Sequence, residues 1–489
     1  MATGAECPVV ARVRSVAARH PGRPALVTDA GQLTYRELWR QVLGWRDRCA
    51  ALDVAPGALV AVLAGPGARW PAAFLGARAA GLVPLLVDVQ QPVERTGALL
   101  AAARPAAVLR SEAGEAERTG EPAPRVLPPE AGYVVFTSGS TGAPKGIVGR
   151  AAGLLAFVDW EIAAVGAGPG TRVAVLTSPS FDVVFRDLLL PLCAGGEAHF
   201  AGRAVRAAPA AVLGWLAERR VEVVHAVPSL AARWLAADGS DGRVDSLRWT
   251  LFAGEPLHGR LVRRWRAAAP STEVVNLYGP SETTLAKFHH RVPGDCGPGL
   301  LPVGRPLDGT VLSLVHPEAT GPVGDGVRQI VITSPDGSLG YLPGTCGAED
   351  AERLRYAPES GTTCFRTRDR GVLDDDGNLV VVGRLDSLVK RRGVFVDLAR
   401  VEAAAAGLAG VTAACCVQLA DGDVVLAVQG FGPAAAAALR RPLRTALGDG
   451  MPDRVTALPV LPLLPGGKAD RRAVADLLDR KETDERRAS

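Results

Sequence analysis

The chain has 489 residues, of which 48% are hydrophobic, and it carries 55 lysines and arginines against 51 aspartates and glutamates. This length exceeds the size at which a single hydrophobic core keeps growing, so we expect at least two domains. A formal net charge of +4 over so long a chain gives no basic surface for nucleic acid, and no apolar run is long enough to span a bilayer. The eight cysteines form no CxxC pair and the N-terminal stretch lacks a signal-peptide pattern, which predicts a cytoplasmic protein.

Apolar strands alternate with amphipathic helical patterns through the first three quarters of the chain. An apolar run at residues 59–63 is followed by a helical pattern at 70–80 and by a second apolar run at 83–87. Such alternation is typical of parallel sheets covered by helices. We therefore expect an α/β fold with a large, multi-sheet N-terminal domain.

The pattern changes near Gly383-Arg384-Leu385-Asp386, which reads as a compact connector. The segment beyond it has strand patterns at 411–419 and 424–428 and helix patterns at 399–408 and 434–447. These are enough for a small α+β domain. We predict a core domain at 1–385, a smaller domain at 386–478 and, because apolar residues then become scarce, a disordered charged tail at 479–489.

The most informative segment, residues 133–146, is an apolar run that leads into alternating hydroxyl and glycine residues and then a lysine. Its glycines allow the backbone to approach an anion closely, its hydroxyls can donate to phosphate oxygens, and its lysine adds a positive charge. The P-loop pattern is absent, because Gly146 rather than Ser or Thr follows the lysine. A second strand follows, so we expect a strand–loop–strand unit that binds nucleotide phosphates, the alternative being a flexible surface hairpin. The predicted phosphate-binding residues are Thr137, Ser138, Gly139, Ser140, Thr141, Gly142 and Lys145.

This loop resembles the phosphate loop of the adenylate-forming enzymes, which include acyl-CoA synthetases, luciferases and the adenylation domains of nonribosomal peptide synthetases. Further motifs of that family recur in order, from Leu33-Thr34-Tyr35-Arg36-Glu37-Leu38 to Gly467-Lys468-Ala469-Asp470-Arg471. The resemblance therefore covers nearly the whole chain. It implies the adenylate-forming fold, in which a large domain is joined by a hinge to a smaller one, and the use of ATP.

The resemblance also implies roles for residues that contact the nucleotide. Lys468 would bridge the substrate carboxylate and the α-phosphate as a catalytic cation, although a lone lysine on a turn is more often only solvated. The segment from Asn276 to Thr284 would bind adenine and phosphate, although Gly279-Pro280 is also common at ordinary turns. In that segment Asn276 would bond the adenine, Tyr278 would stack on it, Glu282 would hold Mg²⁺ and Thr283 would bond the α-phosphate. The remaining nucleotide contacts would be made by Gly254, Asp369 and Arg384, the last two at the ribose.

Two features near the connector remain: the arginines beside Asp369, where this chain departs from the family pattern, and the hinge that the resemblance implies. Arg368 and Arg370 flank Asp369 where the family usually has glycine and leucine, so the local backbone geometry is open. By resemblance, Asp386 would be the hinge about which the small domain rotates. That rotation would alternate Lys468 with the segment 389–393, whose Lys390-Arg391-Arg392 could instead be a solvated turn.

Phe181-Asp182 lies where amino-acid-activating members of the family carry the aspartate that pairs with the substrate α-ammonium. The competing interpretation is a cap for the helix expected at 183–190. The implied pocket is small and accepts serine, alanine or proline, while the Arg186 guanidinium also suits aspartate unless Arg186 and Asp187 form a scaffold ion pair. The pocket-lining residues would be Val183, Arg186, His225, Leu251, Ala253, Leu277, Leu285 and Ala286.

No carrier domain is recognisable in the sequence, so the chain is expected to act alone. The resemblance then implies a ligase that makes aminoacyl-AMP and loads the phosphopantetheine thiol of a separate acyl or peptidyl carrier protein, or coenzyme A. Two other hypotheses are an acyl-CoA synthetase for an acid without an amino group and a non-catalytic binding protein on the same fold. The non-catalytic hypothesis is disfavoured because the chain has all four of the key residues that the resemblance implies: Lys468, Glu282, Asp369 and Thr137.

Overall fold

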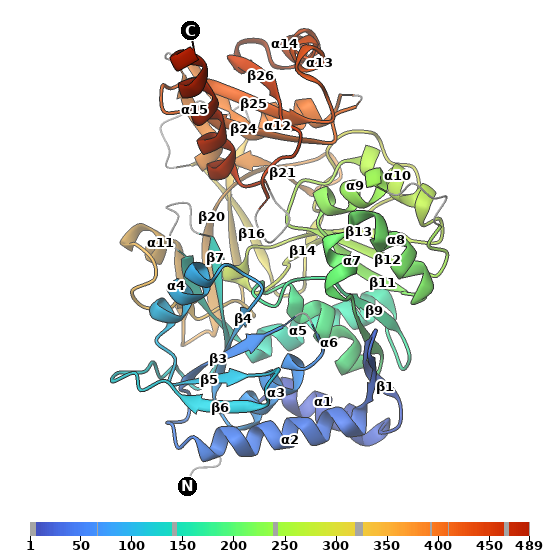
Figure 1. The fold of residues 1–489 in the computed structure, drawn as a ribbon, viewed down its shortest axis with the longest axis vertical. Coiled ribbons are helices and arrows are strands. Elements are labelled where there is room, and N and C mark those ends of the chain that lie inside the picture. Colours follow the sequence, from blue (N-terminus) through green and yellow to red (C-terminus); the bar gives the residue numbers. More distant parts are fainter. Residues whose placement is uncertain are drawn as a thin grey trace.

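The computed structural model describes residues 6–65, 67–138, 144–237, 243–317, 326–391, 394–408, 410–463 and 469–488. Figure 1 shows the N-terminal helices at one end of the long axis and the C-terminal elements at the other. The predicted Gly139, Ser140, Thr141, Gly142 and Lys468 lie outside the described residues.

The first sheet contains a run of parallel strands with antiparallel pairs at both edges. Its parallel strands are β1, β10, β9, β11, β12 and β13, whereas β2, β14 and β15 pair antiparallel. The order in space is β15 (Arg305–Pro306), β14 (Phe288–Arg291), β13 (Glu273–Tyr278), β12 (Trp249–Ala253), β11 (Val223–Ala226), β9 (Arg172–Val175), β10 (Glu197–Phe200), β1 (Pro24–Thr28) and β2 (Gly31–Thr34).

The second sheet also combines parallel strands with antiparallel edges. Every residue of its strand β4 is buried, as expected for a parallel strand covered on both faces. The order is β18 (Gly340–Tyr341), β8 (Pro144–Arg150), β7 (Ala131–Ser138), β4 (Val83–Asp88), β3 (Leu59–Ala64), β5 (Ala107–Arg110) and β6 (Glu115–Arg118). These two sheets confirm the expected α/β class.

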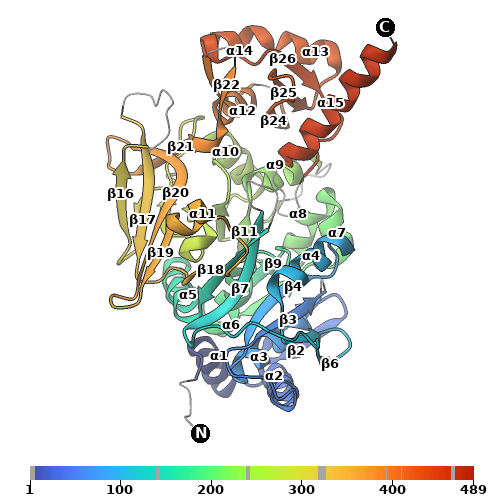
Figure 2. The ribbon, with the colours of Figure 1, turned by 90° about the vertical axis from the view of Figure 1, so that its left-hand side faces the viewer.

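A third, antiparallel sheet leads toward the C-terminal part (Figure 2). It consists of β16 (Val311–Val315), β17 (Arg328–Ser334), β20 (Thr362–Leu373), β19 (Leu354–Ala357) and β21 (Leu379–Arg384). Beyond it lie the hairpin of β22 (Leu388–Arg391) and β23 (Val394–Asp397), and then a small mixed sheet of β24 (Ala413–Gln418), β25 (Val424–Gln429) and β26 (Arg454–Ala457).

Helices cover the sheets. Helix α2 (Tyr35–Ala51) shows how the sequence determines where a helix begins. The Thr34 hydroxyl accepts a hydrogen bond from the Glu37 backbone N–H, and the Glu37 carboxylate accepts one from the Thr34 backbone N–H, which is a capping box. The helices are α1 (Pro8–Arg19), α2 (Tyr35–Ala51), α3 (Trp70–Ala79), α4 (Val93–Ala103), α5 (Ala151–Val165), α6 (Val184–Ala194), α7 (Arg203–Ala207), α8 (Pro209–Glu218), α9 (Pro228–Ala237), α10 (Gly259–Ala268), α11 (Ala348–Arg353), α12 (Leu398–Ala406), α13 (Pro433–Ala438), α14 (Arg440–Leu447) and α15 (Arg471–Ala488).

The residues beyond the connector pack into buried clusters of their own, one around Val396 and Leu426 and one around Val425 and Leu458. A separate core is what a small α+β domain requires. The division at Asp386 itself stays a prediction.

Two expectations about the C-terminal helices differ from the structure. The helix expected at 434–447 is divided into α13 and α14 at Leu439, because Pro442 lacks an N–H and its ring would clash with the carbonyl four residues earlier. The residues expected to form a disordered tail continue α15 as far as Ala488. Lysine, arginine and glutamate are good helix formers, and buried Val474 and Leu478 anchor the helix against β24.

Candidate active site

The predicted phosphate loop lies between two antiparallel strands, as expected. Thr137 is opposite Lys145 on β7 and β8, and Ser138 ends β7. At Gly146 a side chain would place its Cβ 2.9 Å from the Leu342 Cβ, which explains the glycine after the lysine. The hairpin therefore fixes the two ends of the loop.

Two residues predicted to bind the nucleotide, Tyr278 and Arg384, both contact a third, Asp369, although the three come from separate motifs. The Tyr278 hydroxyl donates to Oδ2 of Asp369 at 2.6 Å, and Nη1 of Arg384 donates to Oδ1 at 3.0 Å. Asp369 and Arg384 are opposite each other on β20 and β21, while Tyr278 ends β13. Burial and then the Asp369 carboxylate raise the pKa of Tyr278 well above its ordinary value, so the phenol remains a hydrogen-bond donor.

Asn276 lies on the same strand and is 1% exposed. Its Nδ2 donates to the Pro302 carbonyl at 2.8 Å, whereas its Oδ1 has no hydrogen-bond partner among the described residues. A buried acceptor without a hydrogen-bond partner favours binding of a ligand that has a hydrogen-bond donor at this position. Gly254 follows β12 with a φ of 90°, a conformation that favours glycine.

The chain between β13 and β14 is a strained turn that carries the residues predicted for the metal and the α-phosphate. Thr284 and Leu285 have φ values of 65° and 55°, which non-glycine residues keep only when the surroundings hold them. Tyr341 donates to Oε1 of Glu282 at 2.7 Å, and burial raises the pKa of that carboxyl. The Thr283 hydroxyl donates to a carbonyl of the turn at 2.9 Å. The turn thus orders both predicted residues.

Asp386, the predicted hinge, lies in the short 3₁₀ turn η2 (Leu385–Ser387) between β21 and β22. Arg384 holds its carboxylate with two hydrogen bonds of 2.8 Å. Burial alone would raise the pKa of Asp386, but the hydrogen bonds and charge of Arg384 bring it below its ordinary value. Arg384 therefore joins the predicted hinge to the predicted ribose site.

The two arginines that flank Asp369 both contact carboxylates near the connector. Arg370 is buried and donates to Asp397, the N-cap of α12. Arg368 faces Asp386, with Nη1 and Oδ2 4.0 Å apart. Strand β20 runs through both arginines, so they do not interrupt the strand at Asp369.

Several residues predicted to line the amino acid pocket lie on neighbouring parallel strands, and Ala253 ends β12. His225 pairs with Leu251 across β11 and β12, and Ala253 pairs with Leu277 across β12 and β13. The carboxyl ends of such strands are where α/β sheets bind ligands. Apart from the half-buried Val183, the apolar lining residues share one buried cluster: Leu251, Ala253, Leu277, Leu285 and Ala286.

Asp182 is buried, with 7% of its surface exposed. The N-cap of α6 is Val183, so Asp182 does not occupy the cap position that the competing interpretation requires. Its charge acts on two neighbours, Tyr133 and Glu282, whose pKa values are raised first by burial and further by this carboxylate. Asp182 therefore adds negative charge at the predicted metal residue.

Two other lining residues, Arg186 and His225, belong to a buried charge cluster with Glu161 and Asp187. Nε2 of His225 lies 2.7 Å from Oε1 of Glu161, and Nδ1 lies 3.0 Å from Oδ1 of Asp187. Arg186 Nε lies 3.9 Å from the same Asp187 oxygen. None of these four side chains is more than 4% exposed. We call them the buried quartet.

The charges of the buried quartet balance when His225 is protonated. Burial alone would lower the pKa of His225, but Glu161 and Asp187 raise it above its ordinary value against the opposing charge of Arg186. Two cations then face two carboxylates. The Arg186 guanidinium is thus compensated within the scaffold.

We expect Glu161→Gln to lower the free energy of unfolding by about 3 kcal/mol at roughly pH 6, because His225 loses one of its buried carboxylates. A histidine whose folded pKa exceeds the unfolded value of about 6.5 contributes stability below that value and loses it as the pH rises through the folded pKa. The stability difference between wild type and variant, from urea unfolding, should therefore shrink as the pH rises above about 6.5.

The matched control is Asp159→Asn on the same helix. Asp159 pairs with Arg12 at 2.7 Å, but both side chains are more than a third exposed, so the expected loss is below about 1 kcal/mol with little pH dependence. A wild-type minus Glu161→Gln difference that stays constant from acidic to alkaline pH would contradict a protonated His225.

Sequence reasoning missed Glu161, Tyr341 and Asp350. Glu161 carried a usable signal, because it lies four residues after Phe157 and three after Val158, on the buried face of α5. Asp350 and Tyr341 carried no such sequence signal. Asp350 contacts Lys145, and Tyr341 contacts Glu282, only in the folded structure.

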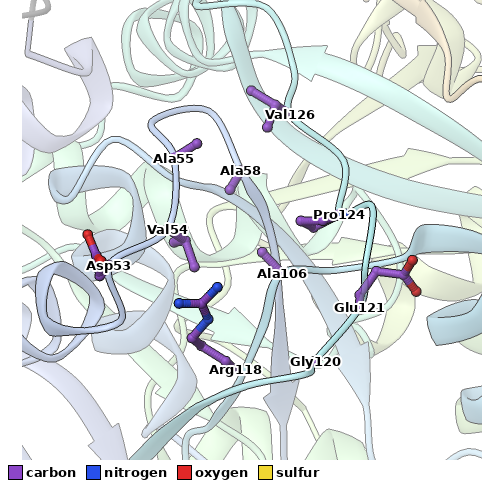
Figure 3. A pocket seen from close by; sticks show the side chains of 10 residues that line it. All are labelled: Asp53, Val54, Ala55, Ala58, Ala106, Arg118, Gly120, Glu121, Pro124 and Val126. Carbon is purple, nitrogen blue, oxygen red and sulfur yellow. The ribbon is translucent and has the colours of Figure 1, made fainter.

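Figure 3 shows a hollow beside β5 and β6 whose lining includes none of the predicted site residues, and we assign it no role. In the part of the chain that the structure describes, no helix has the length and apolar character needed to cross a membrane. The hollow is lined by Asp53, Val54, Ala55, Ala58, Ala106, Arg118, Gly120, Glu121, Pro124 and Val126.

Comparison with known proteins identifies the family. The family described as AMP-binding enzyme matches residues 13–342. Phosphinothricin tripeptide synthetase PhsB of Streptomyces viridochromogenes is 31% identical over 94% of this chain, which spans only 41% of that synthetase. Novobiocin biosynthesis protein H of Streptomyces niveus is 31% identical over 95% of this chain and 81% of its own length.

Solved structures agree with the sequence relatives. The crystal structure of IdnL7 aligns with a TM-score of 0.79 at 26% identity, over 97% of this chain and 99% of that one. Its coverage extends beyond the family match into the C-terminal elements. The chain therefore belongs to the AMP-binding enzyme family, within the adenylate-forming superfamily that its motifs resemble.

Proposed function

We propose that this chain uses ATP to adenylate a small amino acid and then transfers the aminoacyl group to the phosphopantetheine thiol of a separate carrier protein. The observation that carries the nucleotide half of this proposal is the contact of Tyr278, Asp369 and Arg384. Tyr278 lies 91 residues before Asp369 and Arg384 lies 15 residues after it, yet both side chains donate to this single carboxylate.

The nucleotide would use hydrogen-bonding capacity that the protein leaves open. Each carboxylate oxygen of Asp369 accepts one hydrogen bond from the protein, and each retains a lone pair for a ribose hydroxyl. Oδ1 of Asn276 is buried and has no partner among the described residues. It would accept a hydrogen bond from the amino group of adenine. These contacts would fix the base and sugar.

The phosphates would lie between the hairpin of β7 and β8 and the strained turn. The described residues offer no group of three or more His, Cys, Asp or Glu side chains for a metal, so Mg²⁺ would bind Glu282 together with phosphate oxygens, as this ion commonly does. Bound there, Mg²⁺ would offset phosphate charge. The pKa of Glu282, raised by burial, fits a carboxylate that gains a cation when substrate arrives.

The amino acid would place its ammonium on Asp182 and its side chain against the apolar cluster of Leu251, Leu277 and Ala286. A neutral side chain such as that of alanine, serine or proline is favoured over aspartate, because the buried quartet already compensates Arg186. Aspartate remains the second candidate.

In the first step a carboxylate oxygen attacks the α-phosphorus and pyrophosphate leaves. Lys468 would neutralise the two anions as they approach. In the second step the carrier thiol attacks the carbonyl carbon, loses its proton, and AMP leaves. Rotation of the small domain about Asp386 would change the site from adenylation to thiol transfer. This rotation would have to break the hydrogen bond between Arg370 and Asp397, which links the two sides of the connector.

Transfer to a carrier protein is supported by relatives that are named as peptide synthetases, such as PhsB. Exchange of labelled pyrophosphate into ATP across the twenty amino acids and a set of simple acids tests the proposal. We expect exchange with one or a few small amino acids. Exchange only with acids that lack an amino group would reject amino acid activation and favour the acyl-CoA synthetase, and no exchange with any acid would favour a binding protein.

A further inference from the structure

Lys145, at the end of the phosphate loop, is paired with an acid two hundred residues away. Its Nζ lies 2.6 Å from Oδ2 of Asp350, and the two side chains are 9% and 12% exposed. Asp350 belongs to α11, a short helix packed beside β20. No motif in the sequence marks this aspartate.

The second oxygen of Asp350 faces a second cation. Oδ1 lies 3.4 Å from Nη2 of Arg368, which also lies 3.2 Å from the exposed carboxylate of Glu349. The other Arg368 nitrogen, Nη1, faces Asp386. Asp350 therefore stands between the lysine of the phosphate loop and the arginine beside the predicted ribose residue.

Building on the proposed function, we propose that Asp350 is a positioning residue that holds the Lys145 ammonium ready for the triphosphate of ATP. A lysine side chain has several rotatable bonds, and fixing it before binding removes an entropy loss that binding would otherwise include. An ammonium has three donor hydrogens. Asp350 takes one of them at 2.6 Å, which leaves two for phosphate oxygens.

Arg368 makes this arrangement compatible with a polyanion. Lys145 and Asp350 alone would present no net charge, and the carboxylate would repel phosphate. Arg368 at 3.4 Å compensates the carboxylate, so Lys145, Asp350 and Arg368 together carry one positive charge, whereas Glu349, the other acid on Arg368, is 70% exposed and its charge is screened by solvent. The cluster therefore orients the lysine while keeping the site attractive to phosphate.

The test compares Asp350→Asn with Glu349→Gln, its neighbour on the same helix. Both acids contact Arg368, but only Asp350 contacts Lys145. The readout is the Kd of α,β-methylene ATP with Mg²⁺, measured by calorimetry without any amino acid. We expect Asp350→Asn to raise this Kd about tenfold, in line with the loss of one preorganised charge contact, and Glu349→Gln to leave it within about twofold.

A double-mutant cycle with Lys145→Ala separates positioning from scaffolding. If Asp350 acts through the lysine, adding Asp350→Asn to Lys145→Ala should change the Kd less than twofold. Equal effects of Asp350→Asn in both backgrounds, or an unchanged Kd in the single variant, would overturn the proposal. Because the ligand is the nucleotide alone, this result is independent of whether any amino acid supports pyrophosphate exchange.

Discussion

Lys468→Ala is expected to lower amino-acid-dependent pyrophosphate exchange roughly a hundred- to thousandfold. The carboxylate and the α-phosphate are both anions, and their approach in the transition state raises the barrier unless a cation lies between them. An ammonium that contributes about 3 kcal/mol of transition-state stabilisation accounts for that factor. The rate of exchange at saturating ATP and amino acid, with the Kd of the ATP analogue measured beside it, checks the expectation.

The control for this variant is Lys481→Ala, the next lysine along the sequence. It should leave both exchange and nucleotide binding within about twofold. Loss of exchange that is matched by an equal loss of nucleotide affinity would show that Lys468 serves ground-state binding. Full exchange in Lys468→Ala would remove the lysine from the mechanism.

Asp182→Ala is expected to abolish the preference for an amino acid over its analogue without the amino group. Asp182 is 7% exposed, and removing one partner of a buried charge pair costs about 3 kcal/mol, or roughly a hundredfold in kcat/KM for the amino acid. For an alanine-activating enzyme, the ratio of kcat/KM for alanine to that for propionate should fall by this factor. Affinity for the ATP analogue should persist.

The shape-matched variant Asp182→Asn separates recognition from structure. It keeps the side-chain volume and loses the charge, so it should reduce the preference for the amino group as Asp182→Ala does. Parallel loss of activity toward both acids, together with weaker nucleotide binding, would mark Asp182 as a structural residue. Because the N-cap of α6 is Val183, Asp182 is not needed as the helix cap and can bind the substrate ammonium.

The local sequence was sufficient to predict those parts of the site whose geometry is local. The hydroxyl and glycine pattern predicted a strand–loop–strand unit, and β7 and β8 pair in that way with Thr137 opposite Lys145. Gly279-Pro280 in the motif at residues 276–284 is common at turns, and the structure has β13 followed there by η1 (Ser281–Thr283). Backbone hydrogen bonding and glycine conformations follow from nearby residues, so such units can be read from sequence.

Charge compensation by residues far apart in the chain could not be predicted. For Arg186 the sequence left an acidic substrate and an ion pair with Asp187 open; the structure has the ion pair and adds His225 and Glu161, which no local pattern connects to it. In the same way Arg370 looked like an interruption of a family pattern, and the structure gives it Asp397 as a partner. A single charged residue does not show which partner compensates it.

The direct test of the account is the fate of the carboxylate oxygen. The enzyme is incubated with ATP, the amino acid preferred in the exchange panel and hydroxylamine in place of the carrier thiol, with both carboxyl oxygens of the amino acid carrying ¹⁸O. If that carboxylate attacks the α-phosphorus, each AMP retains a single ¹⁸O atom when hydroxylamine takes the aminoacyl group, and mass spectrometry of AMP detects it. AMP without the label, or ADP and phosphate as the products, would contradict the adenylation mechanism.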